Sequence, residues 1–404
     1  MAGSHLETTS SPAIPRAVWL LGFVSLFTDA ATEMIYPLIP VYLSRVLGAS
    51  ALSLGVIEGA AEGVNSVLKV MSGWWSDRRS RRRPIVIAGY ALSSAARPLI
   101  AVAGTWTHVL LIRVLDRTGK GIRSAPRDAM LTRLADAASR GRIFGFHRAM
   151  DHTGAIVGPL LATAFLFFRP GEYRLLFALT AIPGALAVAT LFLVKEPEPE
   201  REVPELNAPV TSGPLPTRLY AVLGIILLFS LGNSADAFLL LRLGDALGTA
   251  TYVPLLWAAL HVVKASLSTW GGALSDRIGR ARVIAMGWAI YALVYLGFAF
   301  TASATTYIAL FLFYGVHFAL AEGAEKALVA DLTPAKQQGT AFGLYNAALG
   351  IGTLIASIAF GYVYQRFSPT LAFGTGAALA GLAALLLLLF GTQNRKLGTS
   401  ELLN

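Results

Sequence analysis

Two pairs of acidic residues stand four positions apart inside otherwise apolar segments, Asp29 with Glu33 and Glu58 with Glu62. This spacing places both carboxylates of a pair on the same face of a helix. Carboxylates inside a membrane are costly, and they usually line a cavity or pair with a cation. A buried carboxyl group brought towards neutrality can take up a proton on one side and release it on the other. We therefore predict proton coupling at one or more of these four residues, with Asp29 and Glu33 favoured.

An alternative for the same four carboxylates is a static ion pair with a neighbouring cation, Arg97, Arg113, Arg117 or Lys120. The early segments of the first half are rich in charge, whereas the matching stretch of the second half offers only Asn233 and Asp236. This asymmetry indicates that ion chemistry is concentrated in the first half. We predict that the following residues line a substrate cavity: Arg113, Asp116, Arg117, Lys120, His147, Arg148, Asp151, His152, Asn233, Asp236, Lys264, Glu322, Glu325 and Lys326.

The His147, Asp151 and His152 cluster has the i,i+4 spacing that a metal site on one helix face requires. Arg148 lies within the same turn and would repel a divalent cation, so we interpret the cluster as a hydrogen-bonded gate and predict no metal site. The chain has no cysteine. The segment 119–121 is too short to be a phosphate-binding loop, so no cofactor and no enzymatic activity are expected.

These residues have to be positioned by membrane-spanning helices. Hydrophobic residues make up 55% of the 404 positions and charged residues only 14%, whereas about a quarter of a soluble domain is charged. Apolar runs long enough to cross a bilayer recur along the chain. We predict an all-α membrane protein with twelve spanning helices near 16–44, 52–72, 84–104, 107–125, 141–168, 172–194, 217–241, 250–272, 282–301, 305–330, 338–364 and 369–391.

The net charge of +10 is explained by topology rather than by nucleic-acid binding. Basic residues cluster in alternate connections, most densely at 78–83 and again at 277–282, whereas connections 104–107 and 301–305 contain almost none. The positive-inside rule makes the basic side cytoplasmic. We therefore expect a multi-pass protein of the inner (cytoplasmic) membrane with both termini in the cytoplasm. Trp19, Trp106 and Trp257 are expected in the aromatic belts at the membrane interfaces.

The chain divides at one polar, Pro- and Glu-rich segment. We predict an N-terminal tail at 1–15, a six-helix bundle at 16–194, a cytoplasmic linker at 195–216, a second six-helix bundle at 217–391 and a C-terminal tail at 392–404. A repeat supports this division, because the Gly73-x-x-Ser-Asp77-Arg78 segment recurs at Gly272-x-x-Ser-Asp276-Arg277. Phe144-Gly145 recurs at 342–343 with nearly the same separation, which indicates two pseudo-repeat halves.

The repeated Gly-x-x-Ser-Asp-Arg-x-Gly-Arg loop resembles the cytoplasmic loop signature of the major facilitator superfamily, and the resemblance covers residues 16–391. It implies that the loop acts as a latch, in which arginines pair with carboxylates in only one conformation. The latch residues are Gly73, Asp77, Arg78, Arg81, Gly272, Asp276, Arg277 and Arg280. Ser80 replaces the usual glycine in the first copy.

A second segment is similar to the fifth-helix signature of the drug/proton antiporter branch, and it consists of Gly145, Gly154, Gly158 and Pro159. Glycines four apart permit close helix packing, and the proline can bend the helix. The first-helix segment Pro37-x-x-Pro40 is similar to a further antiporter element. Arg113 occupies the position of an arginine in another superfamily signature, where Asp116 and Arg117 replace the usual Gln-Gly.

The sequence therefore predicts a secondary active transporter, a proton-coupled antiporter that exports a small organic molecule by alternating access. One alternative is an organic anion as the substrate, bound by Arg113, Arg117, Lys120, Arg148 and Lys264. A divalent metal ion is a weaker alternative, and a sensor or lipid translocator is the weakest. The expected partners are a small-molecule substrate, protons and the lipid bilayer, without nucleic acid, and we expect a monomer.

Overall fold

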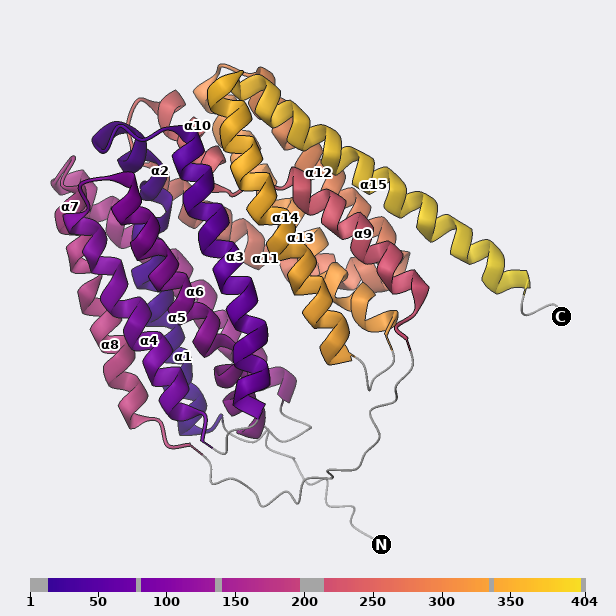
Figure 1. Ribbon diagram of the computed structural model, residues 1–404, viewed down its shortest axis with the longest axis horizontal. Coiled ribbons are helices and arrows are strands. Elements are labelled where there is room, and N and C mark those ends of the chain that lie inside the picture. The colour runs from indigo at the N-terminus through magenta and orange to yellow at the C-terminus, as the bar shows by residue number, and fades with distance from the viewer. Residues whose placement is uncertain (1–13, 78–80, 135–139, 197–213, 334–337, 401–404) are drawn as a thin grey trace, which may run out of the picture.

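Apolar segments fold as helices throughout the part of the chain that the computed structural model describes, residues 14–77, 81–134, 140–196, 214–333 and 338–400 (Figure 1). The helices of the first half are α1 (Arg16–Ile35), α2 (Ile39–Val41), α3 (Ala51–Asp77), α4 (Arg83–Ala96), α5 (Trp106–Arg133), α6 (Arg140–Phe168), α7 (Tyr173–Leu179) and α8 (Ala181–Leu193). Those of the second half are α9 (Thr217–Gly232), α10 (Ala237–Leu247), α11 (Val253–Ile278), α12 (Arg280–Phe300), α13 (Ala304–Asp331), α14 (Gln338–Arg366) and α15 (Pro369–Ser400).

Several of the predicted spans are interrupted where the backbone cannot continue a regular helix. Pro37 and Pro40 have no N–H to donate to the carbonyls of Glu33 and Tyr36, so a tight turn separates α1 from α2. The segment 233–236 separates α9 from α10, and there the side-chain oxygen of Ser357 accepts a bond from a freed backbone N–H. α15 extends to Ser400, beyond the predicted boundary at 391.

The helices pack as two groups that follow the order of the chain (Figure 1). In the first group α1 packs against α6 and α8, and α3 and α4 pack against α5. In the second group α12 packs against α13 and α15, and α9 packs against α14 and α15. The main contacts between the groups are those of α3 with α14 and of α6 with α11. Two helix pairs therefore form most of the interface on which any relative movement of the groups depends.

Small residues permit the closest of these helix approaches. A Cβ on Gly55 of α3 would overlap the backbone carbonyl of Ser357 in α14, and a Cβ on Gly158 of α6 would overlap that of Ala30 in α1. Lipid tails are as apolar as the helices, so close packing of small residues is a main source of helix association in membranes. The backbones approach one another here because these positions have no side chain.

Nine helical segments of the described chain are long and apolar enough to cross a membrane. α3, α5 and α11 contain 27, 28 and 26 residues and are also long enough, but charged residues lower their apolarity. The basic connections 81–83 and 279–282 lie at one end of the molecule, which we call the basic end. The connections 47–50, 103–105 and 301–303 lie at the other end, which we call the opposite end. The protein is thus a polytopic α-helical membrane protein.

The α1–α6 contact generates a stability prediction. Gly158→Ala places a methyl group against the backbone of Ala30, and overpacking of this kind costs about 1–3 kcal/mol. We expect a clear fall in the thermal unfolding midpoint in detergent. Gly381→Ala is the matched control, because a Cβ on this helical glycine of α15 meets open space. It should leave the midpoint unchanged or slightly raised. Equal shifts for the two variants would contradict the close approach.

Candidate functional site

A buried network of ion pairs joins α3, α5 and the short helix η3 (Arg97–Val102) that follows α4. Arg113 Nη2 donates to both carboxylate oxygens of Glu58, at 2.8 and 2.9 Å. Arg97 Nε donates to Asp116 Oδ1 at 2.9 Å, and Arg113 Nη1 lies 3.7 Å from Asp116 Oδ2. Arg113 and Asp116 are one turn apart on α5, which puts both side chains on the face that α3 and α4 cover. Arg117 joins the network at 3.9 Å from Asp116.

Each of the two carboxylates of the network has at least one arginine, and its three arginines leave one positive charge in excess. Breaking a buried pair by removing one partner is strongly destabilising, since an uncompensated charge remains. Of the four acidic residues predicted to couple protons, Glu58 therefore has the geometry of the static ion-pair alternative. Glu62 differs, since its Oε1 accepts a 2.9 Å bond from the neutral amide of Asn65. The two members of this pair, one turn apart on α3, thus have different environments.

Asp29 and Glu33 lie on the face of α1 that is directed towards α5, α6 and α11. Glu33 Oε2 accepts a 2.7 Å hydrogen bond from Trp257 Nε1 of α11. The ring of Tyr36 lies 5.2 Å from that of Trp257, centroid to centroid. The interfacial position predicted for Trp257 was wrong, because its side chain is 4% exposed and donates this bond between the two groups. An indole has a polar handle that favours a partner inside a protein as much as a membrane interface.

Asp29 makes no hydrogen bond or ion pair with any residue that the structure describes. Its electrostatic neighbours are Asp151, Lys120, Glu33 and Arg123. A Cβ on Gly154 of α6 would lie 3.1 Å from the Cβ of Asp29, so the carboxylate stands beside a bare stretch of helix. Asp29 is thus a half-buried carboxylate between cations and other acids.

The predicted gate cluster of α6 is assembled around Asp151. This carboxylate accepts a hydrogen bond from Ser25 of α1, lies 3.6 Å from His147 Nδ1 and 3.6 Å from Arg148 Nη1. His152 has Arg148, Asp151 and Lys264 among its charged neighbours. Within the described residues, no three histidine or acidic side chains are grouped so as to hold a metal ion. The cluster is a hydrogen-bonded link between α1 and α6.

A cavity of about 330 Å³ lies between the two groups at mid-height. α3 contributes Glu62 and Lys69 to its wall, and the break between α9 and α10 contributes Asn233 and Asp236. Asp236 Oδ1 accepts a 2.7 Å bond from the hydroxyl of Tyr314. The structure therefore brings together four charged or amide side chains that come from opposite halves of the sequence.

The second group carries a further buried carboxylate away from this cavity. Glu325 is 6% exposed and accepts bonds from Trp288 Nε1 at 2.9 Å and from the hydroxyl of Tyr345 at 3.0 Å. Glu322 and Lys326 form a 3.3 Å pair on the exposed side of α13. The ammonium of Lys264 lies 3.5 Å from the ring centroid of Phe318. Glu325 thus holds α12 and α14 against α13 rather than facing the cavity.

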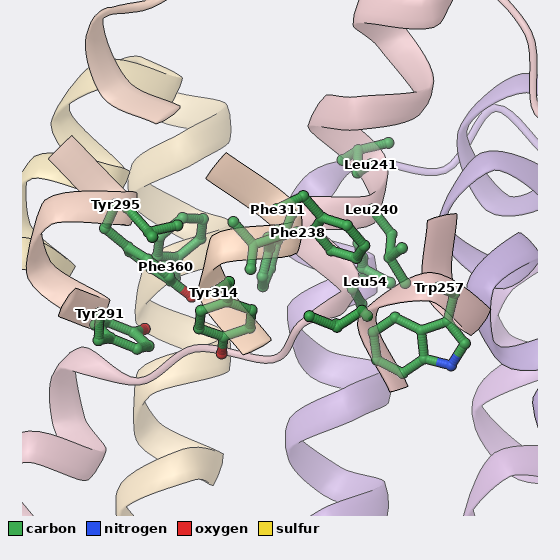
Figure 2. Close-up of a cluster of buried hydrophobic side chains, with 14 of the residues drawn as sticks. Leu54, Phe238, Leu240, Leu241, Trp257, Tyr291, Tyr295, Phe311, Tyr314 and Phe360 are labelled. Carbon is green, nitrogen blue, oxygen red and sulfur yellow. The ribbon is translucent and has the colours of Figure 1, made fainter. Parts of the chain in front are cut away.

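Sequence reasoning missed the aromatic core beside the cavity. Tyr291, Tyr295 and Tyr314 are fully buried and lie close to Phe360 (Figure 2). The rings of Tyr291 and Tyr295 stack with centroids 4.1 Å apart, and the hydroxyl of Tyr291 donates to the carbonyl of Gly232. The signal was available in the four-residue spacing of Tyr291 and Tyr295, which places both rings on one helix face.

The second copy of the repeated loop is described in full and ties α11 to α13. Arg280 pairs with Asp276, donates to Ser275 Oγ at 2.6 Å and lies 3.3 Å from Asp331 Oδ2. Gly272 has open space around it, and Arg277 is exposed. In the first copy Arg81 is exposed, whereas Arg78, the surroundings of Gly73 and the side chain of Asp77 lie outside the description, as do the surroundings of Gly145 in α6. Pro159 is accommodated within the continuous α6.

An arginine of the first group bonds to the second group at the opposite end of the molecule. The Arg45 guanidinium donates to the carbonyls of Gly244 at 2.8 Å and Gly248 at 3.1 Å, and it lies 4.0 Å from Asp245. These carbonyls belong to the last turn of α10, where the helix dipole favours a cation. The end of the first span is therefore attached to the second group at this end.

Comparison with known proteins assigns the family. The model of the Major Facilitator Superfamily matches residues 21–260 and 221–402. An uncharacterized MFS-type transporter of Methanocaldococcus jannaschii is 34% identical over 93% of this chain and 95% of its own. The multidrug resistance protein MdtH of Klebsiella pneumoniae is 23% identical over 82% of each chain. The crystal structure of a mutant of the nucleoside transporter NupG superposes with a TM-score of 0.78 at 12% identity, covering 93% of this chain and all of that one. The resemblance inferred from the loop signature is confirmed, and the chain belongs to the major facilitator superfamily of membrane transporters.

Proposed function

We propose that the protein is a proton-coupled antiporter that exports a small organic molecule by alternating access. The observation that carries the proposal is the hydrogen bond between Glu33 of α1 and Trp257 of α11, with Asp29 one turn away. A titratable carboxylate thus links the two groups that must rock against each other. The match to the multidrug resistance protein MdtH supports export as the direction.

The proposal includes twelve membrane spans. The charged residues that lower the apolarity of α5 are directed inwards, since Arg113 and Asp116 are only 3% and 2% exposed. Those of α3 and α11 behave similarly, with Glu58 buried and Lys264 covered by the Phe318 ring. Charged side chains inside membranes typically face the bundle interior in this way. We infer that α3, α5 and α11 span the bilayer and that, with the nine apolar segments, they make twelve.

The same reasoning assigns the domains and their orientation. We propose two six-helix bundles, 16–194 and 217–391, joined by the linker 195–216. The basic end then faces the cytoplasm, in keeping with the positive-inside rule, and the protein lies in the cytoplasmic membrane with both termini inside. The Arg280 latch would lie at this cytoplasmic face.

The conformation is interpreted as open towards the cytoplasm. Contacts between the groups run from the Arg45–α10 attachment at the opposite end to the approach of Gly350 and Ser66 at mid-height. Nearer the basic end, Arg148 and Lys326 belong to helices of the two groups, and their side chains are 65% and 46% exposed. Exposed charges at such positions favour a water-filled opening over contact with lipid.

The geometry suggests how proton binding would be coupled to movement. An ionised Glu33 accepts a charge-assisted bond from Trp257, which is roughly twice as strong as a neutral one. The empty, ionised carrier is therefore held in the observed conformation. A proton on Glu33 weakens the Glu33–Trp257 bond and permits the two groups to separate at the opposite end. A substrate that binds to the unprotonated carrier has to break the same bond. Asp29 and Lys120 are placed to pass the proton towards the opening.

The organic-anion alternative retains one specific observation. Within the described part of the chain, the ammonium groups of Lys69, Lys120 and Lys264 form no ion pair, although the arginines of the same region are paired. An anion would satisfy these lysines. The anion would compete with the carboxylates of Asp29 and Glu33 for these lysines, so protonation of the carboxylates would strengthen anion binding. A proton that strengthens substrate binding is expected for symport rather than antiport.

Transport in proteoliposomes tests the proton coupling. For a solute that the reconstituted protein moves, we expect accumulation against its gradient to stop when an ionophore dissipates the pH gradient. Asp29→Asn should abolish gradient-driven accumulation and retain solute exchange, because exchange needs no proton release. Glu172→Gln, an isosteric substitution at an exposed residue beside the start of α7, is the control and should behave as the native protein. Accumulation that survives the ionophore would contradict antiport.

Accessibility at the opposite end tests the assigned conformation. Arg45→Ala removes two hydrogen bonds from a charged donor, each contributing about 1.5–3 kcal/mol. A cysteine at Val41, which is buried against α10, should then react with a maleimide about tenfold faster or more. The natural chain has no cysteine, so the label reports this position alone. Arg169→Ala, at an exposed arginine of the same end, should leave the rate unchanged. Equal labelling rates in the Arg45→Ala and Arg169→Ala variants would contradict the proposal that Arg45 keeps the opposite end closed.

A further inference from the structure

Polar side chains are frequent in the wall of the cavity between the two groups. Eight of its twelve lining residues are polar or charged, among them Ser66, Asn346 and Thr353. Pockets for drug-sized ligands are mostly lined by apolar and aromatic side chains. A volume of about 330 Å³ falls at the low end of the range for small-molecule sites. The cavity is therefore suited to a small, water-soluble solute.

The wall also has unfilled hydrogen-bonding capacity of both signs. A carboxylate can accept about four hydrogen bonds, and Asp236 accepts one from Tyr314. Glu62 likewise accepts one, from Asn65. The ammonium of Lys69, two helical turns from Glu62 on α3, has three N–H groups and no hydrogen-bond or ion-pair partner among the described residues. Two under-satisfied acids and one free base thus face the same space.

The aromatic element of the wall does not offer a site for a lipophilic cation. Phe318 is the one aromatic residue of the lining, and the Lys264 ammonium already lies 3.5 Å from its ring centroid. A second cation on that ring would face the charge of Lys264. The buried tyrosines behind the wall are packed against one another rather than open to the cavity (Figure 2). Aromatic cages, which bind quaternary ammonium ligands, are therefore not present in the described lining.

The charges decide between the remaining solute classes. A simple anion would pair with Lys69 and leave Asp236 and Glu62 with one neutral donor each and no cationic partner as water is displaced. A simple cation would pair with the acids and leave Lys69 unpaired. Burying a charge without a partner costs free energy in either case. A solute that carries both an ammonium and an acid group satisfies both sides of the wall at once.

We propose that the solute bound in this cavity is a small hydrophilic zwitterion, whose ammonium group pairs with Asp236 and whose acid group pairs with Lys69. This assignment deepens the proposed transport function and rests on it. Because Asp236 belongs to the second group and Lys69 to the first, such a solute bridges the two moving bodies. Its binding is then sensitive to their relative position, as alternating access requires.

Equilibrium binding to the full-length protein in detergent tests the assignment. The probes are the natural amino acids and a set of dipeptides, with butyrate, butylamine and tetraphenylphosphonium for the other charge classes, and the readout is thermal stabilisation followed by calorimetry. We expect at least one zwitterion to bind, and its N-acetyl and carboxamide derivatives to bind at least tenfold more weakly. Stabilisation by tetraphenylphosphonium, butyrate or butylamine but by no zwitterion would overturn the proposal, as would no binding by any zwitterion.

Two variants that each remove one charge assign the pairing. Asp236→Asn should weaken zwitterion binding by tenfold or more and should no longer distinguish the parent from its N-acetyl derivative. Lys69→Gln should in the same way cease to distinguish the parent from its carboxamide. Glu172→Gln, at an exposed residue outside the cavity lining, is the control and should keep both distinctions. If Asp236→Asn still distinguished the parent from its N-acetyl derivative and Lys69→Gln still distinguished it from its carboxamide, the proposed contacts of Asp236 and Lys69 would be refuted. Binding needs no proton gradient, so a zwitterion that binds without proton-driven transport would refute the antiport proposal alone.

Discussion

A charge inside a membrane has to be paired, hydrogen-bonded or hydrated, and this constraint organises the whole molecule. Arg97, directly after α4, and Arg113 of α5 satisfy it by pairing with Asp116 and Glu58, which fixes the core of the first group. The acids of the second group satisfy it mainly with tyrosine and tryptophan donors. Glu33 satisfies it with a partner in the other group, so its charge acts on the interface rather than on one bundle.

In the proposed transport cycle, this division of roles separates the rigid parts from the moving ones. The Glu58–Arg113 pair and the close α1–α6 packing at Gly158 hold the first group together. The Arg45 attachment and the Glu33–Trp257 bond cross between the groups, and each depends on few hydrogen bonds. Interactions of a few kcal/mol are suitable for a switch, because proton or substrate binding can overcome them. Asp29 lies one turn from Glu33 on α1, whereas Glu62, Lys69 and Asp236 line the cavity between the groups.

The sequence was informative wherever one residue type had one physical consequence. Apolar runs predicted helices, and the repeated loop predicted the family. Pairing partners were less predictable, because i,i+4 spacing places Glu58 and Glu62 on one face without showing that Arg113 reaches only the first. Trp257 was misplaced for a related reason, since its partner Glu33 is 224 positions away along the chain. The break at 233–236, which brings Asp236 to the cavity, contains no proline and gave no local signal.

The central claim is that the charge on Glu33 holds the two groups together at the opposite end. Spin labels are attached to cysteines introduced at Thr105 and Ala302, one in each group. The distance between the two labels is then measured by double electron–electron resonance at pH 8 and pH 5. The account predicts a short separation at pH 8, a longer or broader distribution at pH 5, and the longer distribution at both pH values in Glu33→Gln. Retention of the short separation by Glu33→Gln at both pH values, with the control Glu172→Gln identical to the native protein, would contradict it.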